Sequence, residues 1–172
     1  AVMKLRNALA LGLSLVAFAG MASAAEAQNR NRVNINQTGY NHELAARQQG
    51  DQNRLAIEQR GAYHYVQTIQ AGSRNGVTVG QGGYANDAYV DQLGRRNTAV
   101  VGQEGAFNRG TAIQTGRNNA VGIAQIGSGN SAATNQTGNN NTLGVIQVGN
   151  GQTANVRQSG SGSVAVIIQG SH

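Results

Sequence analysis

Polar and apolar positions alternate along most of the chain, and the alternation restarts at every eleventh position. Each unit reads Asn-x-apolar-x-apolar-x-Gln and is followed by four residues with Gly in second place. Alternation with a period of two predicts a β-strand whose Asn, apolar and Gln side chains share one face. The four residues after Gln predict a turn, because Gly adopts positive φ readily.

The repeat keeps its register from the first unit to the last. Gln occurs in thirteen units, at Gln37, Gln48, Gln59, Gln70, Gln81, Gln92, Gln103, Gln114, Gln125, Gln136, Gln147, Gln158 and Gln169. Gly follows two residues later in twelve of them, at Gly39, Gly50, Gly61, Gly72, Gly83, Gly94, Gly105, Gly116, Gly127, Gly138, Gly149 and Gly160. The opening position holds Asn31, Asn53, Asn75, Asn86, Asn97, Asn108, Asn119, Asn130 and Asn141, and elsewhere His42, His64, Gln152 or Ser163. Strict internal periodicity is typical of a solenoid.

The bulk of the apolar positions reveals a longer period, of two units. Strands that begin at 31, 53, 75, 97, 119 and 141 carry bulky apolar pairs, whereas those at 86, 108, 130 and 152 begin with Ala or Gly. We therefore predict an all-β solenoid of about 6.5 coils with two opposed parallel sheets, in which residue i stacks on residue i+22 at about 4.8 Å. The thirteen strands are expected at 31–37, 42–48, 53–59, 64–70, 75–81, 86–92, 97–103, 108–114, 119–125, 130–136, 141–147, 152–158 and 163–169.

Stacking explains why polar Asn and Gln occupy inward positions. A buried amide without a partner costs about 1–3 kcal/mol. When like residues stack in register, each amide is expected to bond the one above and the one below, as in cross-β structures. These amide ladders should also fix the register, because a slip of one residue would break every pair.

Composition supports continuous strand and limits the possible chemistry. The chain has 25 Gly, no Pro and no Cys, and aromatic residues make up 4%. The absence of Pro suits a chain of hydrogen-bonded strands, although so polar a composition would otherwise favour disorder. Without Cys there is no disulfide or Cys-based zinc site, and we expect no cofactor, no metal and no catalytic residue.

Residues 1–27 have the plan of a secretory signal peptide. Lys4 and Arg6 precede an apolar stretch from about residue 8 to 19, which is too short to span a membrane. Small residues follow, with acceptable cleavage positions after Ala24 or Ala27. We therefore expect export, with residues 28–172 forming the secreted solenoid.

The repeated unit resembles that of the curlins, the subunits of bacterial curli amyloid fibres, over 31–169. Examples of the matching segments are 75–81 and 97–103. The resemblance implies a secreted subunit that forms extracellular fibres on a Gram-negative cell for surface adhesion and biofilm matrix. Implied partners are further copies of the chain, a curlin homologue, an outer-membrane export pore and a periplasmic chaperone.

Two departures from the family pattern leave the role within the fibre open. Asn31 is only the fourth or the seventh residue after the predicted cleavage sites, whereas major curlins usually have a longer segment that addresses the export pore. The formal net charge is +6 and Gly is present in all twelve turns, features that look more like the minor, nucleating subunit. A major fibre subunit is the first reading and a nucleator is the alternative.

The last strand predicts how copies meet. Residues 163–169 are apolar on both faces, so Val164, Val166 and Ile168 should form an assembly edge. The odd number of strands leaves half a coil for a neighbour to complete. We expect head-to-tail polymerisation through the strands near 31–48 and 152–169.

Other function classes fit less well. Asp87 and Asp91 are about 13 Å apart along a strand, beyond glycosidase spacing. An ice-binding or glycan-binding solenoid is an alternative, but outward Thr residues form no regular rows. Exposed Arg with Tyr65 and Tyr89 would suit anionic surface polymers, with simple solvation as the alternative and no specific nucleic acid expected. His42 and His64 should stack, either as Asn substitutes or as a pH or metal site.

Overall fold

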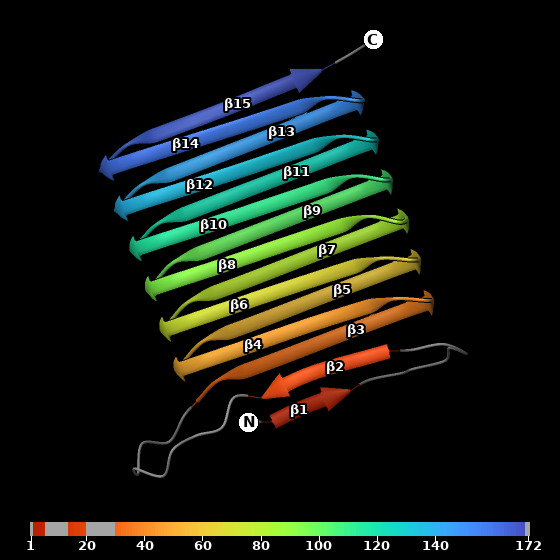
Figure 1. The fold of residues 1–172 in the computed structure, drawn as a ribbon, viewed down its shortest axis with the longest axis horizontal. Coiled ribbons are helices and arrows are strands. Elements are labelled where there is room, and N and C mark those ends of the chain that lie inside the picture. The colour runs from red at the N-terminus through yellow and green to blue at the C-terminus, as the bar shows by residue number, and fades with distance from the viewer. Residues whose placement is uncertain (1, 6–13, 20–29, 171–172) are drawn as a thin grey trace.

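Two parallel sheets face each other and the chain passes between them after every strand (Figure 1). The computed structural model describes residues 2–5, 14–19 and 30–170. One sheet has the order β1-β3-β5-β7-β9-β11-β13-β15 and the other has the order β14-β12-β10-β8-β6-β4-β2. Each strand of the repeat pairs with the strand two units later, so Val121 lies beside Leu143 and Gln103 beside Gln125. The predicted two-sheet solenoid, with two repeat units in each coil, is confirmed.

The strands of the repeat are nine residues long, except for the last. Their bounds are β3 Arg32–Tyr40, β4 Glu43–Asp51, β5 Arg54–Ala62, β6 Tyr65–Ser73, β7 Gly76–Tyr84, β8 Asp87–Arg95, β9 Thr98–Ala106, β10 Arg109–Arg117, β11 Ala120–Ser128, β12 Ser131–Asn139, β13 Thr142–Asn150, β14 Thr153–Ser161 and β15 Val164–Gly170.

These bounds correct the predicted segments of the 31–37 type. Each strand starts one residue later, because the Asn belongs to the bend before it, and continues past Gln and Gly into the turn. The turn residues stay in the sheet because each one pairs with its equivalent in the next coil, as Gly116 does with Gly138. Register with the neighbouring coil, rather than local chain direction, decides where a strand ends.

The turns need two residues with positive φ, not only the Gly that the pattern predicts. Gly94 has a φ of 125°, and two residues later Arg96 has a φ of 58°. A Cβ on Gly94 would overlap the carbonyl oxygen of Gly116 in the next coil. Gly is therefore required there for close approach of the coils as well as for its backbone conformation. The second position accepts several residue types and includes Asn118 and Gly129.

The core is a single apolar seam between the sheets. It includes Leu55 and Ile57 of β5 and Leu143 and Val145 of β13, all at most 2% exposed. From β8 onward the facing strands begin with a small inner residue, such as Ala88 or Ala132, as the two-unit pattern predicts, whereas β4 and β6 carry Leu44 and Val66. A Cβ on Gly110 would come within 3.0 Å of the Val101 Cγ1 atom, so the absence of a side chain there makes room for Val101.

Two further strands lie inside the segment expected to be the leader. β1 (Val2–Leu5) pairs with β3, and β2 (Ser14–Ala19) pairs with β4. They extend the sheets beyond the first repeat (Figure 1). The signal peptide stays a prediction, and its proposed cleavage positions lie outside the described residues. The described part of the chain contains no helix long and apolar enough to cross a membrane.

Candidate functional site: the amide ladders and the terminal strand

The inward Gln side chains form two continuous hydrogen-bonded columns, one in each sheet. In one column Gln81 Nε2 donates to Gln103 Oε1 at 2.9 Å, and Gln103 Nε2 donates to Gln125 Oε1 at 2.8 Å. In the other, Gln92 Nε2 donates to Gln114 Oε1 at 2.8 Å. Every step runs one coil toward the C-terminus, so each column has a direction.

Contacts to the backbone fix that direction. Gln81 Nε2 also donates to the Tyr65 carbonyl at 3.1 Å, and Gln103 Nε2 donates to the Asp87 carbonyl at 2.9 Å. A carbonyl oxygen can only accept, so the atom facing it must be the amide nitrogen. The opposite amide orientation would set an oxygen against an oxygen. The columns are therefore polar structures with a donor end and an acceptor end.

The Asn side chains join the coils in a different way from the one expected. Asn97 Oδ1 accepts the backbone N–H of Asn119 at 3.1 Å, and Asn97 Nδ2 donates to the Gly116 carbonyl at 3.1 Å. Most steps of this ladder thus join an amide to the backbone of the next coil. One direct contact between side chains does occur, from Asn108 Nδ2 to Asn86 Oδ1 at 3.1 Å. The Asn side chain thus links each bend to the next coil by hydrogen bonds to backbone groups.

His42 and His64 stack in the Asn column, as expected. Their ring centroids are 5.1 Å apart and the rings are parallel. His64 Nδ1 accepts the Asn86 backbone N–H at 3.2 Å, while His64 Nε2 lies 2.9 Å from the Arg60 carbonyl. A neutral ring protonated on Nε2 fits both contacts and so replaces the Asn amide. Burial lowers the pKa of His64, and the nearby His42 lowers it further, against the Arg60 carbonyl contact and Glu104, which raise it.

The columns end differently at the two ends of the repeat. At the N-terminal end, Gln37 and Gln48 donate to Gln59 and Gln70, and no donor among residues 30–170 reaches the Oε1 of Gln37 or Gln48. At the C-terminal end, Gln158 Oε1 accepts from Gln136 at 2.8 Å, but the Gln158 Nε2 has no acceptor among the described residues. One end thus offers acceptors and the other offers a donor.

The terminal strand β15 has one paired edge and one open edge. It pairs with β13, and the described strands add nothing beyond it. Val164, Val166 and Ile168 point outward and are 73%, 60% and 72% exposed, while Ala165 and Ile167 pack against the core. The predicted assembly edge therefore lies at the open C-terminal end. Its role in assembly stays a prediction.

Asp87 and Asp91, the acidic pair considered for catalysis, each contact another side chain. Asp87 Oδ2 lies 3.0 Å from Arg109 Nη2 in an ion pair. Burial raises the pKa of Asp91, and a hydrogen bond from Tyr89 opposes that rise. Within the described part of the chain, no group of three or more His, Asp or Glu side chains is placed to hold a metal ion.

The two turn edges of the solenoid carry features that the linear pattern does not reveal. One edge has a column of aromatic rings and the opposite edge has a column of arginines. The members of each column stand at the third or the fourth position after Gln. Consecutive units also end at opposite edges, so neither column appears when each unit is aligned with the next one. Comparing alternate turns would have revealed both columns.

Comparison with known protein families identifies the repeat. A family model described as the curlin associated repeat matches residues 72–105, 94–127 and 116–149. Successive matches begin two repeat units apart, which is the length of one coil in the structure. No curated protein and no solved structure matches the chain.

Proposed function

Because the chain carries the curlin associated repeat over residues 72–149 and so belongs with the proteins built from it, and because it is a two-sheet β-solenoid, we propose that it polymerises head to tail into amyloid fibres. The fibres would lie outside a Gram-negative cell and serve surface adhesion and biofilm matrix. Further copies of the chain are the principal partner. The single observation that carries the proposal is the polarity of the Gln columns. It leaves hydrogen-bond acceptors at the N-terminal end of the repeat and a donor at the C-terminal end.

Unlike ends favour an open polymer over a closed dimer. If two C-terminal ends met, the Gln158 donors would face each other, and two N-terminal ends would oppose the acceptors of Gln37 and Gln48. Joining the N-terminal end of one copy to the C-terminal end of another continues both columns. A contact between different surfaces that does not close on itself generates a filament.

Strand edges supply the rest of the proposed contact. An unpaired edge presents a row of N–H and C=O groups that can pair with another chain. β14 and β15 end the two sheets on one side of the repeat. After Glu104 the sequence contains no Asp or Glu, so few charges oppose the approach of a neighbour.

The substitution Gln158→Glu tests the head-to-tail contact. A carboxylate at this position can still accept from Gln136 within the chain but can no longer donate to a neighbour. We expect normal folding by circular dichroism and slower elongation of seeded fibres, measured by thioflavin fluorescence. Elongation should recover below about pH 4, where the carboxyl group is protonated and can donate.

Ser159→Glu is the matched control, because it adds the same charge to the next residue of β14, on the outward face. It should elongate at nearly the wild-type rate. Equal rates for both variants and the wild type would contradict the proposed contact.

The cellular steps belong to the same proposal. The leader-like residues 1–27 and the family resemblance support export through an outer-membrane pore with a periplasmic chaperone. Since β1 and β2 occupy the N-terminal edges of the sheets, removing them would free that end for assembly. Fibres should therefore form faster from residues 28–172 than from the full chain, when both are diluted from denaturant.

Self-complementary ends support a fibre-forming subunit rather than a chain that acts only as a nucleator. Growth should then show a lag that added fragments of its own fibres abolish. Immediate unseeded assembly, together with strong seeding of a homologous curlin, would instead assign the chain to nucleation.

A further inference from the structure

Four aromatic side chains form a column along one turn edge. Tyr40 and Tyr84 are the last residues of β3 and β7, and Tyr63 and Phe107 directly follow β5 and β9. Successive ring centroids are 5.5, 5.2 and 5.6 Å apart. The rings contact one another yet remain 44–63% exposed. Tyr63 and Phe107 also adopt a left-handed backbone, with φ of 59° and 57°. A large exposed apolar stripe is typical of an interaction surface.

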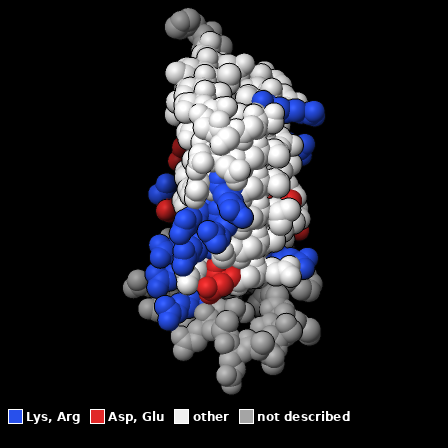
Figure 2. Space-filling model, turned by 90° about the vertical axis from the view of Figure 1, so that its left-hand side faces the viewer, with Lys and Arg blue, Asp and Glu red and all other residues white. Residues whose placement is uncertain are grey.

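The opposite turn edge carries a column of arginines. Arg95 and Arg117 are the last residues of β8 and β10, Arg74 and Arg96 directly follow β6 and β8, and all four are exposed. Arg95 pairs in register with Arg117. Figure 2 looks onto this edge and shows the basic side chains gathered in one stripe over the lower coils, while the upper coils are nearly free of charge.

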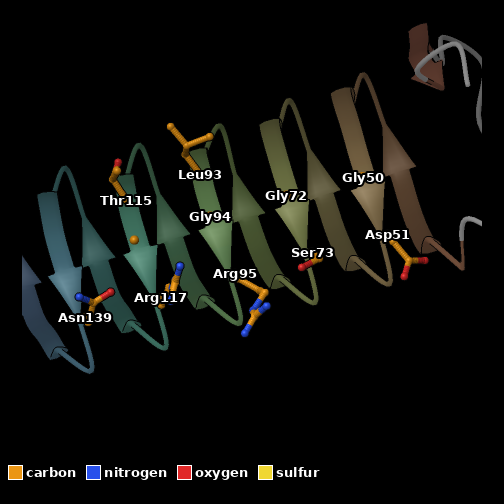
Figure 3. A pocket seen from close by; sticks show the side chains of 11 residues that line it. Gly50, Asp51, Gly72, Ser73, Leu93, Gly94, Arg95, Thr115, Arg117 and Asn139 are labelled. Atoms are coloured by element: carbon orange, nitrogen blue, oxygen red, sulfur yellow. The ribbon is translucent and has the colours of Figure 1, made fainter. Parts of the chain in front are cut away.

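These arginines have few partners within the molecule. Arg74 Nε donates to Gln52 Oε1 at 3.0 Å. None of the ion pairs between described residues includes any member of the column. A shallow groove of about 680 Å³ follows the same edge, with Arg95 and Arg117 on its wall beside the turn glycines (Figure 3). The guanidinium groups are available to an outside partner.

Both columns occupy the same coils. The coil of β5 and β6 carries Tyr63 and Arg74, the coil of β7 and β8 carries Tyr84 with Arg95 and Arg96, and the coil of β9 and β10 carries Phe107 and Arg117. The two members of each set lie at opposite ends of one coil. If a second copy is placed alongside, shifted only along the strand direction, arginines therefore meet aromatic rings at equal height.

The chemistry of the two edges is complementary. A guanidinium group stacks on the face of an aromatic ring and is attracted by its electrons. On the outward face of the sheet that ends at the aromatic edge, Glu58 in the middle of β5 and Glu104 near the end of β9 share Arg60 at 3.5 and 3.9 Å. These two carboxylates and one arginine carry a net negative charge, whereas the arginine column of the neighbour is positive.

We propose that the aromatic column of one copy binds the arginine column of a second copy, so that neighbouring fibres associate side by side. This inference rests on the proposed fibre function. The later coils lack both columns, because the turns at 126–129, 137–140, 148–151 and 159–162 contain only Ile, Val, Gly, Ser, Thr and Asn. Each subunit therefore offers one lateral contact region per edge, confined to its first four coils.

Two multiple variants of the full chain test the contact. The arginine-edge variant is Arg74→Asn, Arg95→Asn, Arg96→Asn and Arg117→Asn. The aromatic-edge variant is Tyr63→Asn, Tyr84→Asn and Phe107→Asn. Asn already occupies equivalent turn positions at Asn41, Asn118, Asn139, Asn140 and Asn150, so the solenoid should tolerate it. Axial growth is checked first by thioflavin fluorescence, and bundling is then scored by electron microscopy.

We expect both variants to form single fibres that fail to bundle. Loss of bundling in the arginine-edge variant would be opposite to the general effect of charge, since removing four positive charges lowers repulsion between fibres. The control Arg32→Asn, Arg54→Asn and Arg157→Asn removes charge from the outer sheet faces and should leave bundling intact. Mixing preformed fibres of the two edge variants should restore lateral association, because each supplies the column that the other lacks.

Several results would overturn the inference. One is normal bundling in either edge variant, and another is no association in the mixture. Suppose that only the arginine-edge variant fails to bundle and that added polyphosphate makes wild-type fibres bundle. The arginine edge would then be assigned to a polyanion instead of the aromatic column. If no chain forms fibres, wild type included, the proposed function fails; fibres with unchanged bundling overturn only the lateral contact.

Discussion

Single residues in this protein act as members of columns, so the same substitution has different effects at different heights. Gly94 is faced by the Gly116 carbonyl of the next coil, whereas nothing lies within 4 Å of a Cβ placed on Gly160. Both residues have positive φ, 125° and 109°. At both positions any residue with a Cβ would strain the backbone, and the two positions differ in the space next to that Cβ.

Gly94→Ala should therefore destabilise the monomer by about 3 kcal/mol or more, because overlap with the next coil adds to the backbone cost. Gly160→Ala should cost roughly 1 kcal/mol, from the backbone alone. Chemical denaturation followed by circular dichroism measures both. Equal losses would show that close approach of the coils is unimportant.

His64 should make the first coils sensitive to acid. Because the folded pKa lies below the ordinary value of 6.5, unfolded chains bind a proton first as the pH falls. The stability that depends on neutral His64 is complete above about pH 6.5 and is lost progressively below it. Protonation of Nδ1 would also set two donors together, since Asn86 N–H points at that atom.

His64→Asn should remove part of this acid sensitivity while preserving the fold, because Asn accepts the same N–H elsewhere in the column. Denaturation midpoints measured between neutral and mildly acidic pH would show a flatter profile for the variant. A profile identical to that of the wild type would exclude His64 as the source.

At the scale of the element, opposite strands are matched in volume. Gly110 leaves room for Val101, whose Cγ1 atom lies 3.0 Å from the position of an added Cβ. Close-packed interiors do not absorb an added side chain without strain.

Gly110→Val should cost about 1–3 kcal/mol through overpacking. Adding Val101→Ala to the same chain should recover part of the loss, because the volume removed lies next to the volume added. A thermodynamic cycle of the two single variants and the double variant measures this coupling. A coupling energy near zero would mean that the strands adjust independently.

Strand periodicity and coil length could be predicted from the sequence because every unit repeats the same inward residues. The strand ends could not, since they depend on pairing with the next coil, as with Gly116 and Gly138. The Asn bonds were expected between side chains but go mainly to backbone groups, because Asn97 lies in the bend and its amide reaches the next turn. The edge columns emerge only when turns are placed on opposite sides of the coil.

At the scale of the whole molecule, the repeat has an odd number of strands, β3 to β15. This number decides how the next copy is rotated when it joins the end of the solenoid. β3 and β15 both belong to one sheet, so the next place in the winding order lies on β14 in the other sheet. A neighbour whose β3 fills that place is turned by half a turn about the fibre axis. Each side of a fibre would then present aromatic and arginine columns alternately, which keeps lateral contacts possible on both sides.

Mass per unit length of the assembled fibre tests the account most directly. A chain of 17.8 kDa whose fifteen described strands make about 7.5 coils, spaced about 4.8 Å apart, should give about 0.5 kDa per Å. Scanning transmission electron microscopy of single fibres measures this value. If each chain instead occupied one flat layer, the fibre would have about 3.7 kDa per Å, and that result would contradict a stacked solenoid.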